Sequence, residues 1–128
     1  MPGSFVSNVG VMTSKMQTGN DGEDAAAEYL IANGYDVLAR NYRYGRAEVD
    51  LIVRKKNWLV FVEVKTRSNS TFGFPEEFVD RAQEELILMA ADNYMYEINW
   101  EGNVRYDIVA VLGTGWDREV RVFEDAFY

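Results

Sequence analysis

The side chains best suited to chemistry lie in two short segments, residues 47–52 and 61–65, where carboxylates and a lysine interrupt apolar residues. Both segments have the alternation of a β-strand, and a turn-like, charged sequence separates them. We therefore predict a β-hairpin. With a two-residue loop at residues 56–57, Lys55 lies opposite Trp58.

In that register Asp50 faces Glu63, and Glu48 faces Lys65. Because the side chains of a strand alternate between its two faces, these four charged groups share one face. The other face is expected to be apolar, with Val49, Leu51, Val53, Val60, Val62 and Val64. Two opposed carboxylates repel each other unless something positive binds them, so the pattern indicates a metal site with a lysine beside it.

The composition limits which metal could bind. The chain contains no cysteine and no histidine, which excludes disulfides, thiolate ligands, cysteine nucleophiles and the usual general base. A metal must then be held by oxygen atoms, which favours Mg²⁺ or Mn²⁺ over zinc. Aspartate, glutamate and lysine on one sheet face suit phosphodiester hydrolysis, because a cation stabilises charge on phosphate and a lysine orients the attacking water.

The distribution of charge points to an anionic substrate. The net charge is −8, yet residues 40–67 carry eight basic and three acidic side chains. A basic segment around a few carboxylates suits a polyanion held at a metal. The alternative is a hairpin decorated with solvating charge. The basic residues of the segment are Arg40, Arg43, Arg46, Arg54, Lys55, Lys56, Lys65 and Arg67.

The remaining elements predict one α/β domain with a mixed sheet flanked by helices. Residues 1–18 have no periodicity and are predicted to be a flexible arm, followed by the domain at residues 19–128. The long helix is expected to begin just after Pro75, with Val79, Ala82, Leu86, Met89 and Ala90 on one face. Helices are placed at about residues 21–33 and 76–98, and strands at 35–44, 104–112 and 119–123 beside the hairpin.

Nothing in the sequence predicts a membrane partner or export. No apolar run approaches the ~20 residues that span a bilayer. The first residues lack a basic region followed by a continuous apolar stretch. With no cysteine either, a cytoplasmic location is expected.

The hairpin motifs A-E-V-D-L-I and F-V-E-V-K-T-R resemble the YraN-like proteins, a bacterial family classed with endonucleases. That family is similar to archaeal Holliday-junction resolvases within the PD-(D/E)XK nuclease superfamily. The resemblance covers about residues 19–127 and implies a restriction-endonuclease-like fold. It also rests on Gly22-Glu23, Gly34-Tyr35, Asn41-Tyr42-Arg43, Phe72-Gly73 with Pro75, Arg105-Tyr106-Asp107 and Asp125-Ala126-Phe127.

The resemblance implies a role for each charged residue. Asp50 and Glu63 would bind Mg²⁺ or Mn²⁺, and Lys65 would be the catalytic lysine. Glu23 would be a helix-borne glutamate near the metal, unless it is only a first-turn helix glutamate. Glu48 would orient Lys65 or join the metal shell, unless it forms only a cross-strand ion pair with Lys65.

The implied substrate is DNA, and branched DNA by similarity to the resolvases. Arg40, Arg43, Arg46 and Arg67 would position its phosphates. Pairing of two copies is also implied, because resolvases cut two strands symmetrically. The competing hypotheses are a non-catalytic nucleic-acid- or protein-binding module that retains the fold, and a structural dimer whose hairpin charges serve solubility.

Several other side chains have structural interpretations that we favour. Asp107 is expected to pair with an arginine of the basic segment, and Gln83 to be an ordinary exposed residue. The aromatic residues Tyr42, Tyr44, Trp58 and Phe61 could stack on bases, but packing in the core or hairpin is expected. Two positions depart from the family pattern: Ala47 replaces a glycine, and Gln83-Glu84-Glu85 replaces a Lys-Gln pair. The second departure removes positive charge from a surface that could contact DNA.

Overall fold

The structure, a computed structural model, describes residues 21–67, 79–113 and 118–127. The predicted arm at residues 1–18 and the motif residues Phe72, Gly73 and Pro75 lie outside this part. The elements are α2 (Asp21–Ala32), β2 (Asp36–Tyr44), β3 (Ala47–Lys55), β4 (Trp58–Arg67), α3 (Arg81–Ile98), β5 (Asn103–Leu112) and β6 (Glu119–Phe123). These bounds confirm the predicted order of helices and strands.

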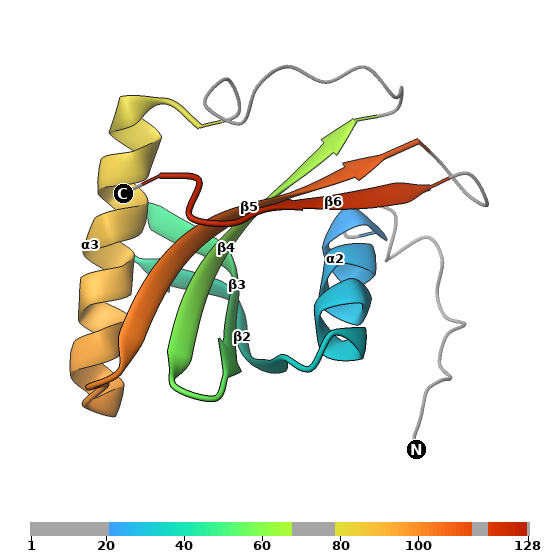
Figure 1. Cartoon of the computed structure of the whole chain (residues 1–128). Helices are drawn as coiled ribbons and strands as arrows, with labels where there is room; N and C mark the ends of the chain where they lie inside the picture. Colours follow the sequence, from blue (N-terminus) through green and yellow to red (C-terminus); the bar gives the residue numbers. More distant parts are fainter. Residues whose placement is uncertain (1–20, 68–78, 114–117, 128) are drawn as a thin grey trace.

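The five strands form one mixed sheet in the order β2-β3-β4-β5-β6. Strands β4 and β5 are parallel, with α3 as the crossover between them, and the other neighbours are antiparallel. Helices α2 and α3 lie on opposite sides of the sheet (Figure 1). The fold is therefore the predicted α/β domain with a mixed sheet between helices.

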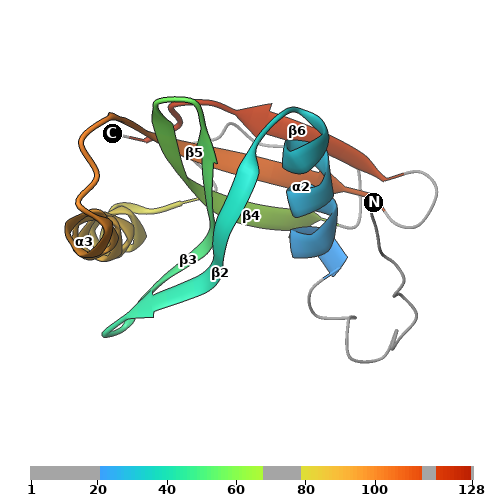
Figure 2. The same ribbon diagram turned by 90° about the horizontal axis from the view of Figure 1, so that it is seen from below.

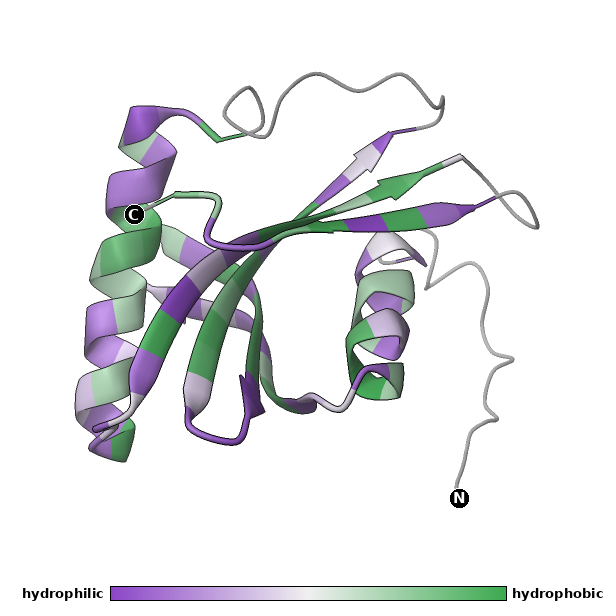
Figure 3. Cartoon of the chain, in the orientation of Figure 1, coloured by the Kyte–Doolittle hydropathy of each residue, from purple (hydrophilic) through white to green (hydrophobic). Residues whose placement is uncertain are grey.

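Each face of the sheet carries its own apolar cluster. Residues of β4 and β5 alternate between the two clusters, and the central strands are the most hydrophobic part of the sheet (Figure 3). Phe61 is fully buried on the α3 side, where its ring stacks on Tyr106 at 5.6 Å between centroids. Core packing is thus confirmed for this aromatic residue, whereas Trp58 and Tyr44 stay about two-fifths exposed.

The predicted register of the β3–β4 hairpin is confirmed near its turn, where Lys55 pairs with Trp58 and Leu51 pairs with Val62. Lys56 has a positive φ of 56° in the loop. The backbone pairing between the two strands ends at Leu51 and Val62. At residues 47–49, β3 stays paired with β2 but not with β4. Figure 2 shows this end of the β2–β3 hairpin projecting away from β4.

This divergence corrects one sequence prediction. Val49 does not share the apolar face of Leu51: it packs in the α3-side cluster, whereas Leu51 packs on the α2 side. The neighbouring strand is irregular here: the β2–β3 register shifts between Val37 and Ala39, and Asn41 adopts a left-handed φ of 53°. Irregularities of this kind bend a strand pair and increase its twist.

Helix α3 begins later than predicted. Asp80 is its N-cap and accepts a hydrogen bond from the Gln83 backbone N–H at 2.8 Å, so the helix starts at Arg81. The expected apolar face is also wrong in part, because Met89 is 54% exposed. The fully buried residues of α3 are Ile87, Ala90 and Ala91. No helix in the described ranges is long and apolar enough to cross a membrane.

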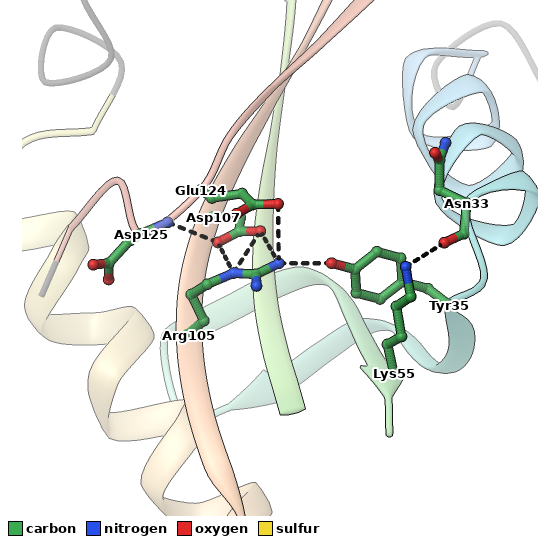
Figure 4. Close-up of polar contacts among 7 residues, drawn as sticks. All are labelled: Asn33, Tyr35, Lys55, Arg105, Asp107, Glu124 and Asp125. Carbon is green, nitrogen blue, oxygen red and sulfur yellow. Dashed lines mark hydrogen bonds and ion pairs between the residues drawn. The ribbon is translucent and has the colours of Figure 1, made fainter. Parts of the chain in front are cut away.

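Asp107 is paired with an arginine, but not with one from the basic segment. Arg105, two residues earlier on the same strand, contacts both of its carboxylate oxygens at 2.9–3.2 Å. The same guanidinium donates to the Tyr35 hydroxyl at 2.7 Å, and the Asp125 backbone N–H donates to Asp107 at 2.9 Å (Figure 4). Asp107 therefore links β5 to the segment that follows β6, and through Arg105 it links β5 to Tyr35, which lies between α2 and β2.

Candidate active site

The candidate site is centred on Asp50 and Glu63, at the point where β3 parts from β4. Because the backbone pairing has ended there, the Asp50 carboxylate takes over as acceptor and binds the Val64 backbone N–H at 2.7 Å. The Glu63 carboxyl lies close enough for each of the two groups to influence the ionisation of the other. The structure therefore brings together the two side chains that the hairpin register predicted to be neighbours.

The electrostatics of this pair are unfavourable for two ionised carboxylates. Burial, followed by the nearby charge of Glu63, raises the pKa of Asp50 to about 7, although the Val64 N–H opposes this shift. Burial also raises the pKa of Glu63, while Lys65 and Gln83 oppose that increase. With its pKa raised to about 7, Asp50 is partly protonated near neutral pH, and a bound cation would favour the ionised form of both groups.

Lys65 and Gln83 contact the same carboxylate oxygen of the pair. The Lys65 Nζ lies 3.2 Å from Glu63 Oε2, and the Gln83 side-chain N–H donates to that oxygen at 2.9 Å. The expectation that Gln83 is an ordinary exposed residue is therefore wrong. A signal was present in the sequence, since Asp80 three residues before Gln83 is the spacing of a helix cap and fixes the first turn of α3 beside the sheet.

Glu23 and Glu48 lie beside the central pair and are linked through Asn41. With its amide nitrogen facing them, Asn41 donates to Glu23 Oε1 and to Glu48 Oε2 at 3.2 Å each. The cross-strand ion pair between Glu48 and Lys65 is not formed, because β3 has left β4 at that level. Glu48 instead lies 3.6 Å from an Arg43 nitrogen on β2.

The four arginines expected to contact phosphates lie in different settings. Arg46 is exposed and lines the site, whereas Arg43 faces Glu48. Arg40 forms a 2.6 Å ion pair with Asp24 of α2, and Arg67 donates to the Thr66 carbonyl at the end of β4. The structure therefore places one of the four, Arg46, directly in the site.

These residues surround a hollow of about 180 Å³ between the hairpin and α3. The donor set fits Mg²⁺ or Mn²⁺, because Asp50 and Glu63 supply two close carboxylates whose repulsion a cation would relieve. Within residues 21–67, 79–113 and 118–127, no three acidic side chains gather around one point as metal ligands. The hollow is lined by Arg46, Glu48, Asp50, Glu63, Gln83, Leu86 and Ile87.

Glu23 reaches this region because a glycine precedes it. Gly22 is buried in the first turn of α2, and a Cβ at this position would collide with Thr66 on β4. We expect Gly22→Val to cost about 1–3 kcal/mol of unfolding free energy, because α2 must move away from the sheet. Urea denaturation would measure the loss, with Glu28→Val on the exposed face of α2 as the control. An unchanged stability would show that the helix accommodates the side chain at no cost.

The end of the β2–β3 hairpin is held to α3 by Tyr42. Its hydroxyl donates to Glu97 at 3.1 Å and accepts from Asn93 at 2.7 Å, and its ring packs edge-on against Tyr94. We expect Tyr42→Phe to lower stability by about 1 kcal/mol. Amide hydrogen exchange should also become faster at residues 43–48, and not elsewhere in the sheet. The same substitution at the exposed Tyr44 is the control; equal effects of the two would contradict this anchoring role.

The fold and the site define a class of protein: a single small α/β domain whose mixed sheet and two helices are compatible with a nuclease-like fold. A family model described as "Uncharacterised protein family UPF0102" matches residues 22–111. The chain belongs to this family, which is the YraN-like group that its motifs resemble.

Individual relatives agree with this assignment over most of their length. A UPF0102 protein of Flavobacterium psychrophilum is 39% identical over 117 residues, covering 91% of this chain and 98% of the relative. A UPF0102 protein of Bacteroides thetaiotaomicron is 41% identical over 117 residues, with 91% and 97% covered. A third, from Cytophaga hutchinsonii, is 41% identical over 98 residues, with 77% and 87% covered.

Proposed function

We propose that the protein is a metal-dependent endonuclease that hydrolyses phosphodiester bonds of DNA. The observation that carries this proposal is the buried pair of Asp50 and Glu63 with the Lys65 ammonium 3.2 Å from Glu63. A structural role alone would not favour two carboxylates that repel each other beside a solvent-accessible hollow. The resemblance of the hairpin motifs to nucleases supports the same conclusion.

Each of the residues at the candidate site would have a separate role in such a reaction. Asp50 and Glu63 would hold Mg²⁺ or Mn²⁺, while Gln83 fixes the rotamer of Glu63 through its 2.9 Å hydrogen bond. When bound, the cation neutralises charge on the scissile phosphate and lowers the pKa of a water molecule. Lys65 orients that water or offsets the negative charge that develops on phosphate. Glu23 and Glu48, linked by Asn41, supply polar groups beside the pair.

The exposed cations around the hollow support a nucleic-acid substrate. Arg46, in the turn between β2 and β3, lines the hollow. Arg43 lies near the end of β2 in the same β2–β3 hairpin, and its side chain is 73% exposed. Both side chains can contact backbone phosphates without a change in the backbone of the β2–β3 hairpin. Branched DNA is proposed as the preferred form from the resemblance to resolvases, and the hairpin, which projects from the sheet, gives these arginines access to strands that diverge (Figure 2).

The test has two stages. Mn²⁺ binding is measured first by electron paramagnetic resonance, and cleavage of linear, flapped and four-way-junction DNA follows. We expect Asp50→Asn to lower cleavage by about 10³-fold or more with loss of Mn²⁺ binding, and Lys65→Met by about 10²-fold with binding retained. Glu28→Gln, an exposed change on α2, is the control. Cleavage that survives both substitutions would come from a contaminant and would overturn the proposal.

A binding module that retains this fold without turnover is the second candidate. The observation that favours it is that only two carboxylates meet at the centre of the site, with no third one close enough in the described ranges. Under this alternative, the protein binds Mn²⁺ and junction DNA but leaves the DNA intact. Gln83→Ala would then weaken Mn²⁺ binding without any change in DNA strand length.

A further inference from the structure

A second concave surface lies at the other end of α3, away from the candidate active site. This hollow has a volume of about 430 Å³ and is open to solvent. It lies about 20 Å from Gln83, since Tyr96 is 13 residues further along the same helix and each step adds about 1.5 Å. Its lining residues are Asp92, Met95, Tyr96, Asn99, Trp100 and Glu101.

The base of this hollow is held in place by the turn that follows α3. Asn99 caps the helix in a left-handed conformation, and the Trp100 backbone N–H donates to the Met95 carbonyl at 3.0 Å. The Trp100 indole N–H donates to the Asn103 carbonyl at 3.0 Å. A Cβ at Gly102 would collide with the side chain and backbone carbonyl of Asn57 as well as with the Trp100 ring, so this glycine allows the turn to pack closely on both. The indole is therefore a pre-organised surface rather than a loose side chain.

The aromatic side of the hollow is exposed to an unusual degree. Tyr96 is 81% exposed, and Met89, two turns earlier on the same side of the helix, is 54% exposed. Tyr96 lines the hollow, and Met89 lies about 10 Å from it along the helix. Large exposed apolar side chains on one side of a helix are suited to contact with another molecule. The sequence had placed Met89 in the core, so this surface could not be seen from the periodicity of α3.

The electrostatics of the hollow select a cation. Its charged lining residues, Asp92 and Glu101, are both acidic. The last turn of α3 contains no basic residue, so the negative end of the helix dipole is not neutralised from within the helix. The Trp100 ring already faces the chain's own Arg54 guanidinium, 5.0 Å from its centroid, whereas the Tyr96 ring is 81% exposed and open to a further cation. Carboxylates beside tryptophan and tyrosine suit a guanidinium or ammonium group.

We propose that this hollow binds an arginine or lysine side chain from a basic, partly apolar segment of a partner protein. The apolar neighbours of that side chain would contact Tyr96 and Met89. The partner is another protein rather than a second copy, because two copies of a chain with a net charge of −8 repel each other, whereas a basic segment of another protein is attracted. The interaction does not depend on whether the candidate active site hydrolyses DNA.

The test uses a short blocked peptide with one arginine between two leucines, titrated into the full ¹⁵N-labelled chain. We expect the Trp100 indole N–H and the amides of residues 92–101 to shift, while the Trp58 indole N–H stays constant. Replacing the arginine by citrulline, which has the same shape without charge, should weaken binding about fivefold or more. Tyr96→Ala should weaken it about threefold.

Charge-matched variants separate the hollow from the general acidity of the chain. Asp92→Asn with Glu101→Gln should weaken binding about fivefold, whereas Glu28→Gln with Glu85→Gln, both exposed and outside the hollow, should leave it within twofold. Equal binding of the citrulline peptide, or equal losses in the two double variants, would overturn the proposal. If the same resonances shift with protein concentration alone and sedimentation shows a dimer, the occupant is a second copy and the partner assignment is wrong.

Discussion

Replacing Asp50 by asparagine should make the metal-free protein more stable at pH 8 and, at the same time, unable to bind Mn²⁺. The first effect follows from the site itself, where burial and Glu63 raise the pKa of Asp50 to about 7 from an ordinary value of 3.8. Asparagine keeps an oxygen that can accept from the Val64 N–H, and it carries no charge that must be buried. The substitution therefore tests whether the charge of Asp50 serves to bind a cation rather than to stabilise the fold.

The sign of the pH dependence follows from linkage. A carboxyl group whose pKa is raised by folding contributes stability at pH values below its unfolded pKa, and that contribution is lost as the pH rises through its folded pKa. The wild-type apoprotein should accordingly lose stability between about pH 4 and pH 7. An increase in the pKa of Asp50 from 3.8 to about 7 corresponds to about 4 kcal/mol. Because Asp50 keeps some contact with solvent, which screens these interactions, we expect about half of that amount.

The measurement is urea denaturation at pH 5 and pH 8 in the presence of a chelator. Asp50→Asn should exceed the wild type by about 2 kcal/mol at the higher pH and by much less at the lower one. Addition of Mn²⁺ should stabilise the wild type and leave the variant unchanged, because a ligand stabilises the state that binds it. Asp36→Asn, an exposed carboxylate on β2, is the control. A variant less stable than the wild type at both pH values would show that the carboxylate itself supports the fold.

The sequence was sufficient to predict the fold because each element has a local signal. The alternation in β5 separates Tyr106 and Ile108 from Val109 and Val111, and the two pairs lie in different clusters. The turn at residues 56–57 fixed the register of the hairpin near its tip. These are short-range patterns, in which propensity and burial favour the same structure.

The arrangement of the site was predicted less completely, because it depends on where the backbone pairing of β3 with β4 ends. Period-two alternation cannot show that β3 leaves β4 beyond Leu51, nor that β2 has a register shift between Val37 and Ala39 and a left-handed residue at Asn41. That divergence sends Glu48 to Arg43 instead of Lys65, and moves Val49 to the α3 side. The contact of Gln83 with Glu63 likewise requires the packing of α3 on the sheet, which the helix pattern alone does not specify.

Truncation of Asp107 should produce the largest loss of stability in the chain without disturbing the candidate active site. Asp107 is 1% exposed and accepts from Arg105 and from the Asp125 backbone N–H. Asp107→Ala leaves the partly buried Arg105 guanidinium without its main counter-charge and the Asp125 backbone N–H without its acceptor. The loss of one partner from a buried ion pair costs about 3–5 kcal/mol. The spacing of Arg105 and Asp107, two residues apart on one face of a strand, is the sequence signal for this pair.

A double-mutant cycle distinguishes this charge effect from simple loss of packing. Asp107→Leu should destabilise the protein strongly, and adding Arg105→Met should recover about 1–3 kcal/mol, because an apolar pair has no unpaired charge. Asp107→Asn, which keeps an acceptor for the Asp125 N–H, should fall between the wild type and Asp107→Ala. Mn²⁺ binding by Asp107→Asn should be unchanged at a temperature where the variant is folded. Weakened Mn²⁺ binding under those conditions would instead connect this ion pair with the candidate active site at Asp50 and Glu63.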